Sequence, residues 1–229
     1  MKKILFCTVL SLLFTISFYS QKAPRYYEVN NAEAEEKAGY KNKLPLKYFN
    51  LDGSQLSKKE FKKIVKKRRL LQIPGDSLHH RKLVKRENHG MIKDYPKFKK
   101  LIETELDTKI DPEKPIVVIY YPGPNTCNSS GSATKKTRNK WFSEMEAGII
   151  GKTNEILYLY KTTKGMKDRY DLDKYKKDPQ GIMEQLFFPY NYPCSSFVVI
   201  GKTGKYITFY GEFGKPLVWK FIDYVRKKY

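Results

Sequence analysis

Cysteine is the residue type in this sequence that could most directly carry chemistry. Cys127 lies in the segment YYPGPNTCNSSGS, directly after the apolar run IVVIYY, and is one of three cysteines in 229 residues. Lys135, Lys136 and Arg138 follow, in what should be the first turns of a helix. A helix N-terminus and nearby cations lower the pKa of a thiol and make it a better nucleophile. Cys127 is therefore a reactive thiol, half of a structural disulfide, or a small unpaired loop residue, and the three cations either serve a thiolate or anionic ligand or are simply solvated.

The first twenty residues have the three-part layout of a secretory signal peptide. Lys2 and Lys3 precede an apolar stretch, and small and polar residues follow it up to Ser20. The apolar stretch is shorter than the ~20 residues that cross a bilayer. We therefore expect residues 1–20 to be cleaved and the protein to be periplasmic or secreted. Cys127 and Cys194 then remain, and an oxidising compartment permits two such cysteines to pair.

The chain is strongly basic, with 45 Lys and Arg against 24 Asp and Glu and a formal net charge of +21. The excess is spread along the chain, which indicates a solvated surface with weak, non-specific attraction to anionic surfaces. Lys58–Arg69 contains eight basic residues on a helix that a capping-box pattern, Ser57 to Glu60, should start. This helix is either a solvated face or a contact with a membrane or an anionic polymer. The export signal and the lack of a recognisable module argue against specific nucleic-acid binding.

No pattern in the first half of the chain predicts a metal or cofactor site. Asp52-Gly53 is similar to the middle of a calcium loop, but this register places Lys59 where a carboxylate is needed. His79, His80 and His89 lie in a loop-like stretch whose arginines and lysines oppose a cation. We expect no metal and no cofactor.

The second half alternates apolar strands with amphipathic helices. The pattern gives the order βαβαββα, in which the first crossovers allow parallel strands and the last two strands form a tight hairpin. It predicts an α/β fold with a mixed sheet and helices on both faces. The expected strands are 115–121, 155–160, 195–200 and 205–211, and the expected helices are 134–147, a broken helix over 171–188, and 215–229.

This element order resembles the thioredoxin-like superfamily, as do the strand that ends at a cysteine-bearing loop and the Tyr192-Pro193 pair before the third strand. The chain also looks like exported Bacteroidota thioredoxin-fold proteins that lack the Cys-x-x-Cys motif. The resemblance covers residues 112–229. It implies a thioredoxin-like domain there, preceded by a basic, mainly helical extension over residues 21–111.

The resemblance also implies a site. In this family a Cys-x-x-Cys motif starts the helix after the first strand, and a cis-proline faces it. Cys127 is then the candidate thiol, Ser130 occupies the second-cysteine position, and Pro193 is the expected cis-proline. Cys194, beside Pro193, would lie close to Cys127 as its candidate partner.

Two functions follow from this resemblance. One is an exported thioredoxin-fold protein that exchanges thiols and disulfides, through Cys127 and Cys194, with an unknown protein partner. The other is a non-catalytic binding or structural module in which a Cys127–Cys194 bridge only stabilises the fold. The chain departs from the family because Cys127-Asn128-Ser129-Ser130 replaces the dithiol motif.

Overall fold

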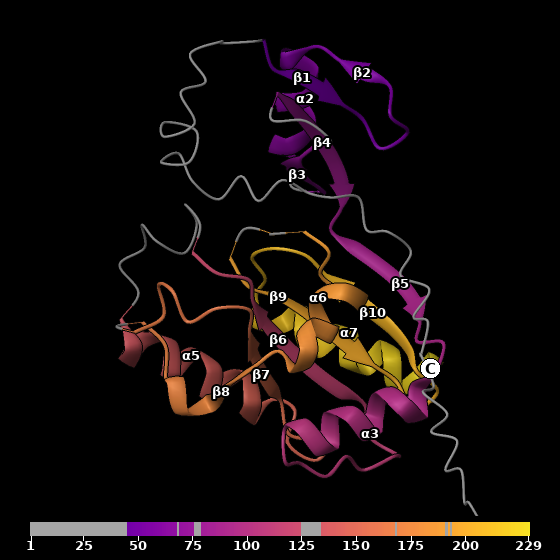
Figure 1. Cartoon of the computed structure of the whole chain (residues 1–229), viewed down its shortest axis with the longest axis vertical. Helices are drawn as coiled ribbons and strands as arrows, with labels where there is room; N and C mark the ends of the chain where they lie inside the picture. Colours follow the sequence, from indigo (N-terminus) through magenta and orange to yellow (C-terminus); the bar gives the residue numbers. More distant parts are fainter. Residues whose placement is uncertain are drawn as a thin grey trace, which may run out of the picture.

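The computed structural model describes residues 45–67, 69–75, 79–124, 134–167, 169–190, 192 and 194–229. They form an α/β structure with two mixed sheets and several helices. Figure 1 shows a small sheet at one end of the long axis and a larger sheet, with its helices, at the other. The expected α/β class with a mixed sheet is confirmed.

The larger sheet has six strands, and its centre corresponds to the predicted strands. β6 and β7 run parallel, β9 is antiparallel to β6, and β10 closes a hairpin with β9. A further strand pairs at each edge, β8 parallel to β7 and β5 antiparallel to β10. The order across the sheet is β5 (Glu87–Met91), β10 (Lys205–Phe209), β9 (Ser196–Ile200), β6 (Ile116–Tyr121), β7 (Leu157–Tyr160) and β8 (Tyr175–Lys177).

Helices cover both faces of this sheet because its central strands are apolar on both sides. Every residue of β6 is buried, and successive side chains enter two different clusters. Residues of α3 (Tyr95–Glu105) and α6 (Ile182–Leu186) belong to the first cluster, and residues of α5 (Lys135–Ala147) and α7 (Lys215–Lys228) to the second. The sheet is therefore the middle layer of three.

The smaller sheet corrects one prediction. The described residues of 45–86 contain four strands and one helix, so this part of the expected extension is not mainly helical. Basic residues obscured a strand pattern here: in β3, Leu71 and Ile73 are buried and the intervening Gln72 is exposed. The strand order is β2 (Gln55–Leu56), β1 (Lys47–Phe49), β4 (His80–Lys85) and β3 (Leu70–Pro74), and α2 (Lys58–Lys66) packs on the sheet.

The larger sheet also begins earlier in the chain than the expected boundary at residue 112. β5 adds the edge strand next to β10, and Phe98 and Ile102 of α3 are buried in the first cluster. The expected broken helix over 171–188 contains a strand as well, β8, between the 3-10 turns Leu172–Lys174 and Pro179–Gly181. The observed order from β6 onward is therefore βαββαββα, one strand more than predicted.

The predicted signal peptide, residues 1–20, lies outside the described residues, so cleavage and export stay predictions. Within the described part of the chain, no helix has both the length and the apolar character needed to cross a membrane.

Candidate functional site

Of the four predicted site residues, the structure describes Cys194. Cys127, Ser130 and Pro193 lie outside the described residues. Cys194 is half-buried, lies two residues before β9 and is disulfide-bonded. Because both of the other cysteines also lie outside the described residues, the pairing with Cys127 stays a prediction.

The backbone at Cys194 has an uncommon conformation. Its φ is +64°, in the left-handed region, and it is one of three non-glycine residues with positive φ among the described residues. Such a conformation costs on the order of 1 kcal/mol and persists where the surroundings fix it. The start of β9 is fixed in this way, because the buried Ser196 hydroxyl accepts a hydrogen bond from the backbone N–H of Gly211 at 3.1 Å.

Sheet register places Cys194 near the carboxyl end of the central strand β6. Tyr120, near the carboxyl end of β6, pairs with Ser196 at the start of β9. Strands β6 and β9 are antiparallel, so the segment before β9 and the loop after β6 leave the sheet side by side. This loop, which opens with Pro122, is the one in which the sequence places Cys127.

The first residues of this loop are tightly held. Gly123 has a φ of +122°, and a Cβ added there would lie 3.1 Å from Thr162 Cγ2. The Tyr121 hydroxyl donates a hydrogen bond to the Lys164 carbonyl at 3.0 Å. The loop therefore leaves β6 along a path fixed by the segment that follows β7.

Helix α5 begins beyond the loop, at a capping box between Thr134 and Thr137. Of the three predicted cations, Lys135 forms an ion pair with Asp171 at 3.1 Å, and Arg138 contacts a tyrosine described below. Lys136 is exposed and has no partner among the described residues. Two of the three cations are thus held by local partners.

Tyr170 is a site residue that the sequence did not reveal. Its ring lies under the Arg138 guanidinium at 4.5 Å, and its hydroxyl accepts a hydrogen bond from Arg138 Nη1 at 3.2 Å. A side-chain hydrogen bond also joins Tyr170 to Ser195, the residue after Cys194. Tyr170 therefore connects the first turns of α5 with the segment that carries the disulfide.

Burial keeps the tyrosines in this region neutral. Desolvation raises the pKa of Tyr170, although the nearby Arg138 charge opposes it. Desolvation also raises the pKa of Tyr121, whose ring centroid lies 5.0 Å from that of Tyr170, to about 12. Both phenols thus act near neutral pH as hydrogen-bonding groups and not as bases. No sequence pattern pointed to Tyr170, because it lies in a polar, irregular stretch, RYDLDK, with no periodicity.

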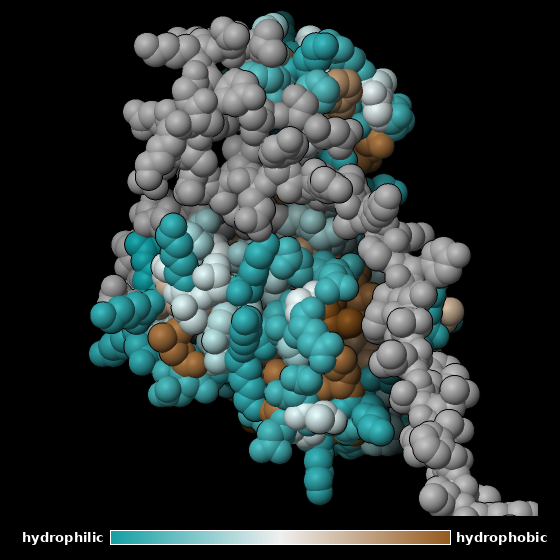
Figure 2. Space-filling view, in the orientation of Figure 1, coloured by the Kyte–Doolittle hydropathy of each residue, from teal (hydrophilic) through white to brown (hydrophobic). Residues whose placement is uncertain are grey.

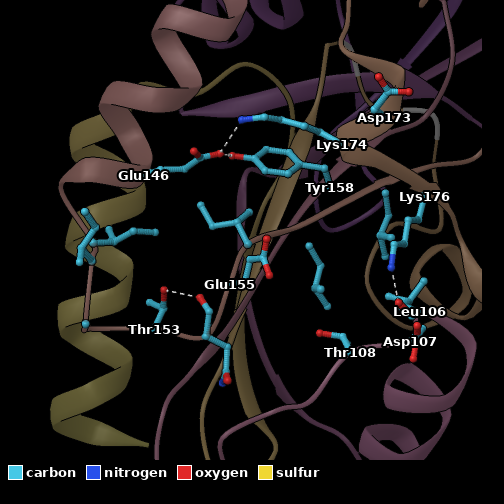
Figure 3. A pocket seen from close by; sticks show the side chains of 17 residues that line it. Leu106, Asp107, Thr108, Glu146, Thr153, Glu155, Tyr158, Asp173, Lys174 and Lys176 are labelled. Atoms are coloured by element: carbon cyan, nitrogen blue, oxygen red, sulfur yellow. Dashed lines mark hydrogen bonds and ion pairs between the residues drawn. The ribbon is translucent and has the colours of Figure 1, made fainter.

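A pocket of about 560 Å³ lies elsewhere, between the end of α3, the C-terminal part of α5, strand β7 and the edge strand β8. Figure 3 shows how its charged groups contact one another. Glu146 accepts a hydrogen bond from the Tyr158 hydroxyl and pairs with Lys174 at 3.7 Å, while Lys176 donates to the Leu106 carbonyl. No group of three or more potential metal ligands occurs among the described residues. Because the disulfide at Cys194 carries chemistry of its own, we place the candidate site there and not in this pocket.

Comparison with known proteins adds no assignment: no protein-family model, no curated protein and no solved structure matches this chain. A functional interpretation therefore rests on the residues and the geometry described above.

Proposed function

We propose that this chain is an exported thioredoxin-fold protein that exchanges disulfides with thiols of other proteins, through a bridge between Cys194 and Cys127. The observation that carries the proposal is the disulfide at Cys194, near the carboxyl end of the central strand β6. An oxidising compartment, which the N-terminal sequence predicts, preserves such a bridge.

The arrangement of the larger sheet supports the fold assignment. The parallel pair β6–β7, joined through α5, followed by the antiparallel hairpin β9–β10 and the closing helix α7, agrees with the order expected from the family. Strands β5 and β8 extend this core at its edges. Cys194 lies two residues before β9, whose first residue pairs with Tyr120 near the end of β6, and the resemblance expects the active site after that strand.

The exchange needs no group beyond the two cysteines and a partner with two thiols. A partner thiolate attacks one sulfur of the bridge, the S–S bond breaks, and the other cysteine leaves as a thiolate. The second thiol of the partner then attacks the mixed disulfide and releases the first cysteine. Two electrons and two protons pass to this protein, which ends with two thiols, and the partner ends with a disulfide.

The surroundings of Cys194 suit such an exchange. The residue is half-buried, so a partner can reach it, and its left-handed backbone is a local strain of the kind found at functional sites. Arg138 and Tyr170 fix the adjacent segment through Ser195. The exposed Lys136 adds positive charge near the start of α5, which favours a thiolate.

A second function is favoured by the local pairing of the other cations. Lys135 is held by Asp171 and Arg138 by Tyr170, so they stabilise the fold and are not free to act on a thiolate. On this alternative the disulfide is structural, and the protein is a non-catalytic binding module.

The reduction potential of the bridge separates the two functions. We expect the protein purified from an oxidising compartment to contain no free thiol and to be reduced near roughly −120 to −230 mV, the range of dedicated oxidoreductases. A potential below about −300 mV would favour the structural alternative. Two free thiols in the native protein would rule out both.

Single substitutions then identify the attacking residue. We expect Cys127→Ser and Cys194→Ser each to abolish disulfide exchange with a dithiol peptide. With a disulfide-bonded peptide in place of the dithiol, the variant that keeps the more accessible sulfur should attack the peptide bridge, release one peptide sulfur as a thiolate and remain as a mixed disulfide, visible by mass spectrometry. A matched control, Ser143→Ala at an exposed position of α5, keeps both sulfurs and should retain exchange.

A further inference from the structure

Helix α2 carries a dense row of positive charge on one side. Its lysines recur at intervals of four residues, so they form two adjacent rows along the helix. Within each row, neighbouring lysines are about 6 Å apart along the helix axis. All of them are exposed. One row holds Lys58, Lys62 and Lys66, and the other holds Lys59, Lys63 and the C-cap residue Lys67. We refer to these six residues as the lysine face.

The lysine face has no acidic partner in the part of the chain that the structure describes. The carboxylates among the described residues of 45–86 are Asp52 and Glu60, and serines engage both of them. Asp52 accepts hydrogen bonds from Ser54, and Glu60 accepts them from Ser57. None of the six lysines has an ion-pair partner in the described part of the chain. No described carboxylate relieves their mutual repulsion, so an external anion that binds there is favoured electrostatically.

The opposite side of α2 is occupied by the fold. Phe61 is fully buried with Tyr48 and Leu83, and Ile64 and Val65 pack against the same cluster. An interfacial membrane helix needs its apolar side free to enter the lipid. The sequence left a membrane contact open for this helix, and the packing of Phe61 removes insertion as a means of binding.

We propose that the lysine face binds a linear anionic polysaccharide. Lysine ammonium groups are flexible point charges that suit sulfate, phosphate or carboxylate groups without demanding a fixed geometry. The two rows span about half of the helix circumference, which a flexible chain can follow and a flat bilayer cannot. The exposed helix ends in basic residues as well, since Lys66 and Lys67 close it and Arg69 follows.

Nucleic acid fits this surface less well. Single-strand binding relies on exposed aromatic rings on which bases stack. The Phe and Tyr residues of the small sheet and α2 are Tyr48 and Phe61, which are buried together, and Phe49, which packs on His80. An exported protein, as the N-terminal sequence predicts, would also meet polysaccharide more readily than nucleic acid.

The test compares two charge-matched variants of the full chain. One replaces Lys58, Lys62, Lys63 and Lys66 by glutamine. The control replaces four exposed lysines of the larger sheet and its helices by glutamine: Lys93, Lys100, Lys109 and Lys220. Binding to heparin, to a short duplex DNA and to vesicles of equal phosphatidylcholine and phosphatidylglycerol is measured at several salt concentrations. Circular dichroism checks that both variants fold.

We expect the α2 variant to lose about tenfold or more in heparin affinity, with the salt dependence of log K reduced by roughly one per lysine removed. The control should lose less than about threefold. Equal losses in both variants would overturn the proposal, because net charge alone would then explain binding. Absence of heparin binding, or tighter α2-dependent binding to DNA or vesicles, would also overturn it. None of these outcomes depends on the redox behaviour of the disulfide.

Discussion

The two sheets of this protein differ in how much they bury. The small sheet and α2 surround a cluster with three buried residues, Tyr48, Phe61 and Leu83. The larger sheet has extensive buried clusters on both faces, and it also takes in Leu71 and Ile73 from the small sheet. The small sheet therefore depends on its neighbour for part of its core.

The two parts of the chain, residues 45–86 and 87–229, also differ in how their lysines are paired with carboxylates. In residues 87–229, lysines form ion pairs with nearby carboxylates; Lys99–Glu103 and Lys161–Glu184 are examples. In residues 45–86, the lysines of α2 have no such partner in the described part of the chain. Figure 2 shows a mostly hydrophilic surface over the described residues of both parts. Some lysines around the larger sheet thus have acidic partners, whereas the lysine face of α2 has none among the described residues.

This difference assigns separate roles to the two parts. Packing around the larger sheet fixes the position of Cys194, whereas the small sheet holds a charged helix in place. The comparison predicts that matched substitutions will have larger and more global effects in the larger sheet.

The largest effect is expected from aromatic truncation. Phe197 is fully buried and contacts the rings of Phe213 and Phe221, so Phe197→Ala should lower the free energy of unfolding by about 3–5 kcal/mol. Phe61→Ala in α2 removes an equally buried ring from a much smaller cluster. We expect its effect to be confined to residues 45–86. Denaturant unfolding and amide hydrogen exchange measure the two effects.

The pattern of amide hydrogen exchange along the chain tests this prediction. Phe61→Ala should deprotect the amides of α2, β1 and β2 while those of β6 and β9 stay protected. If β6 and β9 lose protection to the same extent, the two sheets unfold as one unit and the proposed division of roles is wrong.

The next effect concerns glycines that the two parts need for different reasons. A Cβ at Gly148 would lie 2.5 Å from the Trp219 ring, where the end of α5 meets α7, so Gly148→Ala should cost about 1–3 kcal/mol by overpacking. Gly53 lies in open space, but its φ is +84°. Gly53→Ala should therefore cost only about 1 kcal/mol, through backbone strain.

Thermal unfolding of the two glycine variants provides the measurement. Trp219→Leu supplies a control, since a smaller side chain there should reduce the cost of Gly148→Ala but not that of Gly53→Ala. Equal costs in both backgrounds would show that space at Gly148 is not the cause.

Sequence periodicity predicted the central elements of the larger sheet because their side chains are sorted by burial. β6, α5, β7, β9, β10 and α7 all lie within the predicted ranges. The edge strand β5 could not be predicted in this way. Its sequence, ENHGM, has no alternation, and its position depends on pairing with β10, where Gly90 leaves room for the Tyr206 ring. Pairing between distant segments carries no local signal.

The candidate site was predictable only where a residue type carries its own chemistry. Cysteine drew attention to Cys194, and the structure places it in a disulfide. Tyr170 and Ser195 were not predictable, because their importance comes from contacts between a loop and a distant helix. The Lys–Asp pairing of Lys135 was missed for the same reason.

A smaller effect is expected from the two capping boxes, which use similar chemistry in the two parts. Ser57 caps α2 and Thr134 caps α5 through hydrogen bonds to the N3 residue. Ser57→Ala and Thr134→Ala should each cost about 1 kcal/mol locally. The loss at Ser57 should raise amide exchange in α2 alone, whereas the loss at Thr134 should also lower the global melting temperature. Ser57→Thr and Thr134→Ser, which keep the hydroxyl, serve as controls.

The smallest effect is a pH dependence of stability, which should have opposite signs at the starts of two helices, α2 and α6. Hydrogen bonds from the Ser57 side chain and backbone lower the pKa of Glu60 below its ordinary 4.5. Burial raises the pKa of Asp178 above its ordinary 3.8, against the backbone N–H groups of Met183 and Glu184, which donate to it. Each shift means that the folded and unfolded chains bind protons differently.

The sign of each contribution follows from the shift. Stability from Glu60 is complete above pH 4.5 and is lost as the pH falls through its lowered pKa, so acid weakens the start of α2. The folded chain protonates Asp178 at a higher pH than the unfolded chain does, so the contribution of Asp178 to the unfolding free energy rises as the pH falls towards 3.8. Carboxyl-carbon NMR titration should place the two midpoints on opposite sides of these ordinary values. Ser57→Ala should move the Glu60 midpoint back towards 4.5 and leave that of Asp178 unchanged. Midpoints displaced in the same direction would show that burial does not dominate at Asp178. The contrast between the exposed carboxylate of Glu60 in α2 and the buried one of Asp178 beside the larger sheet would then be wrong.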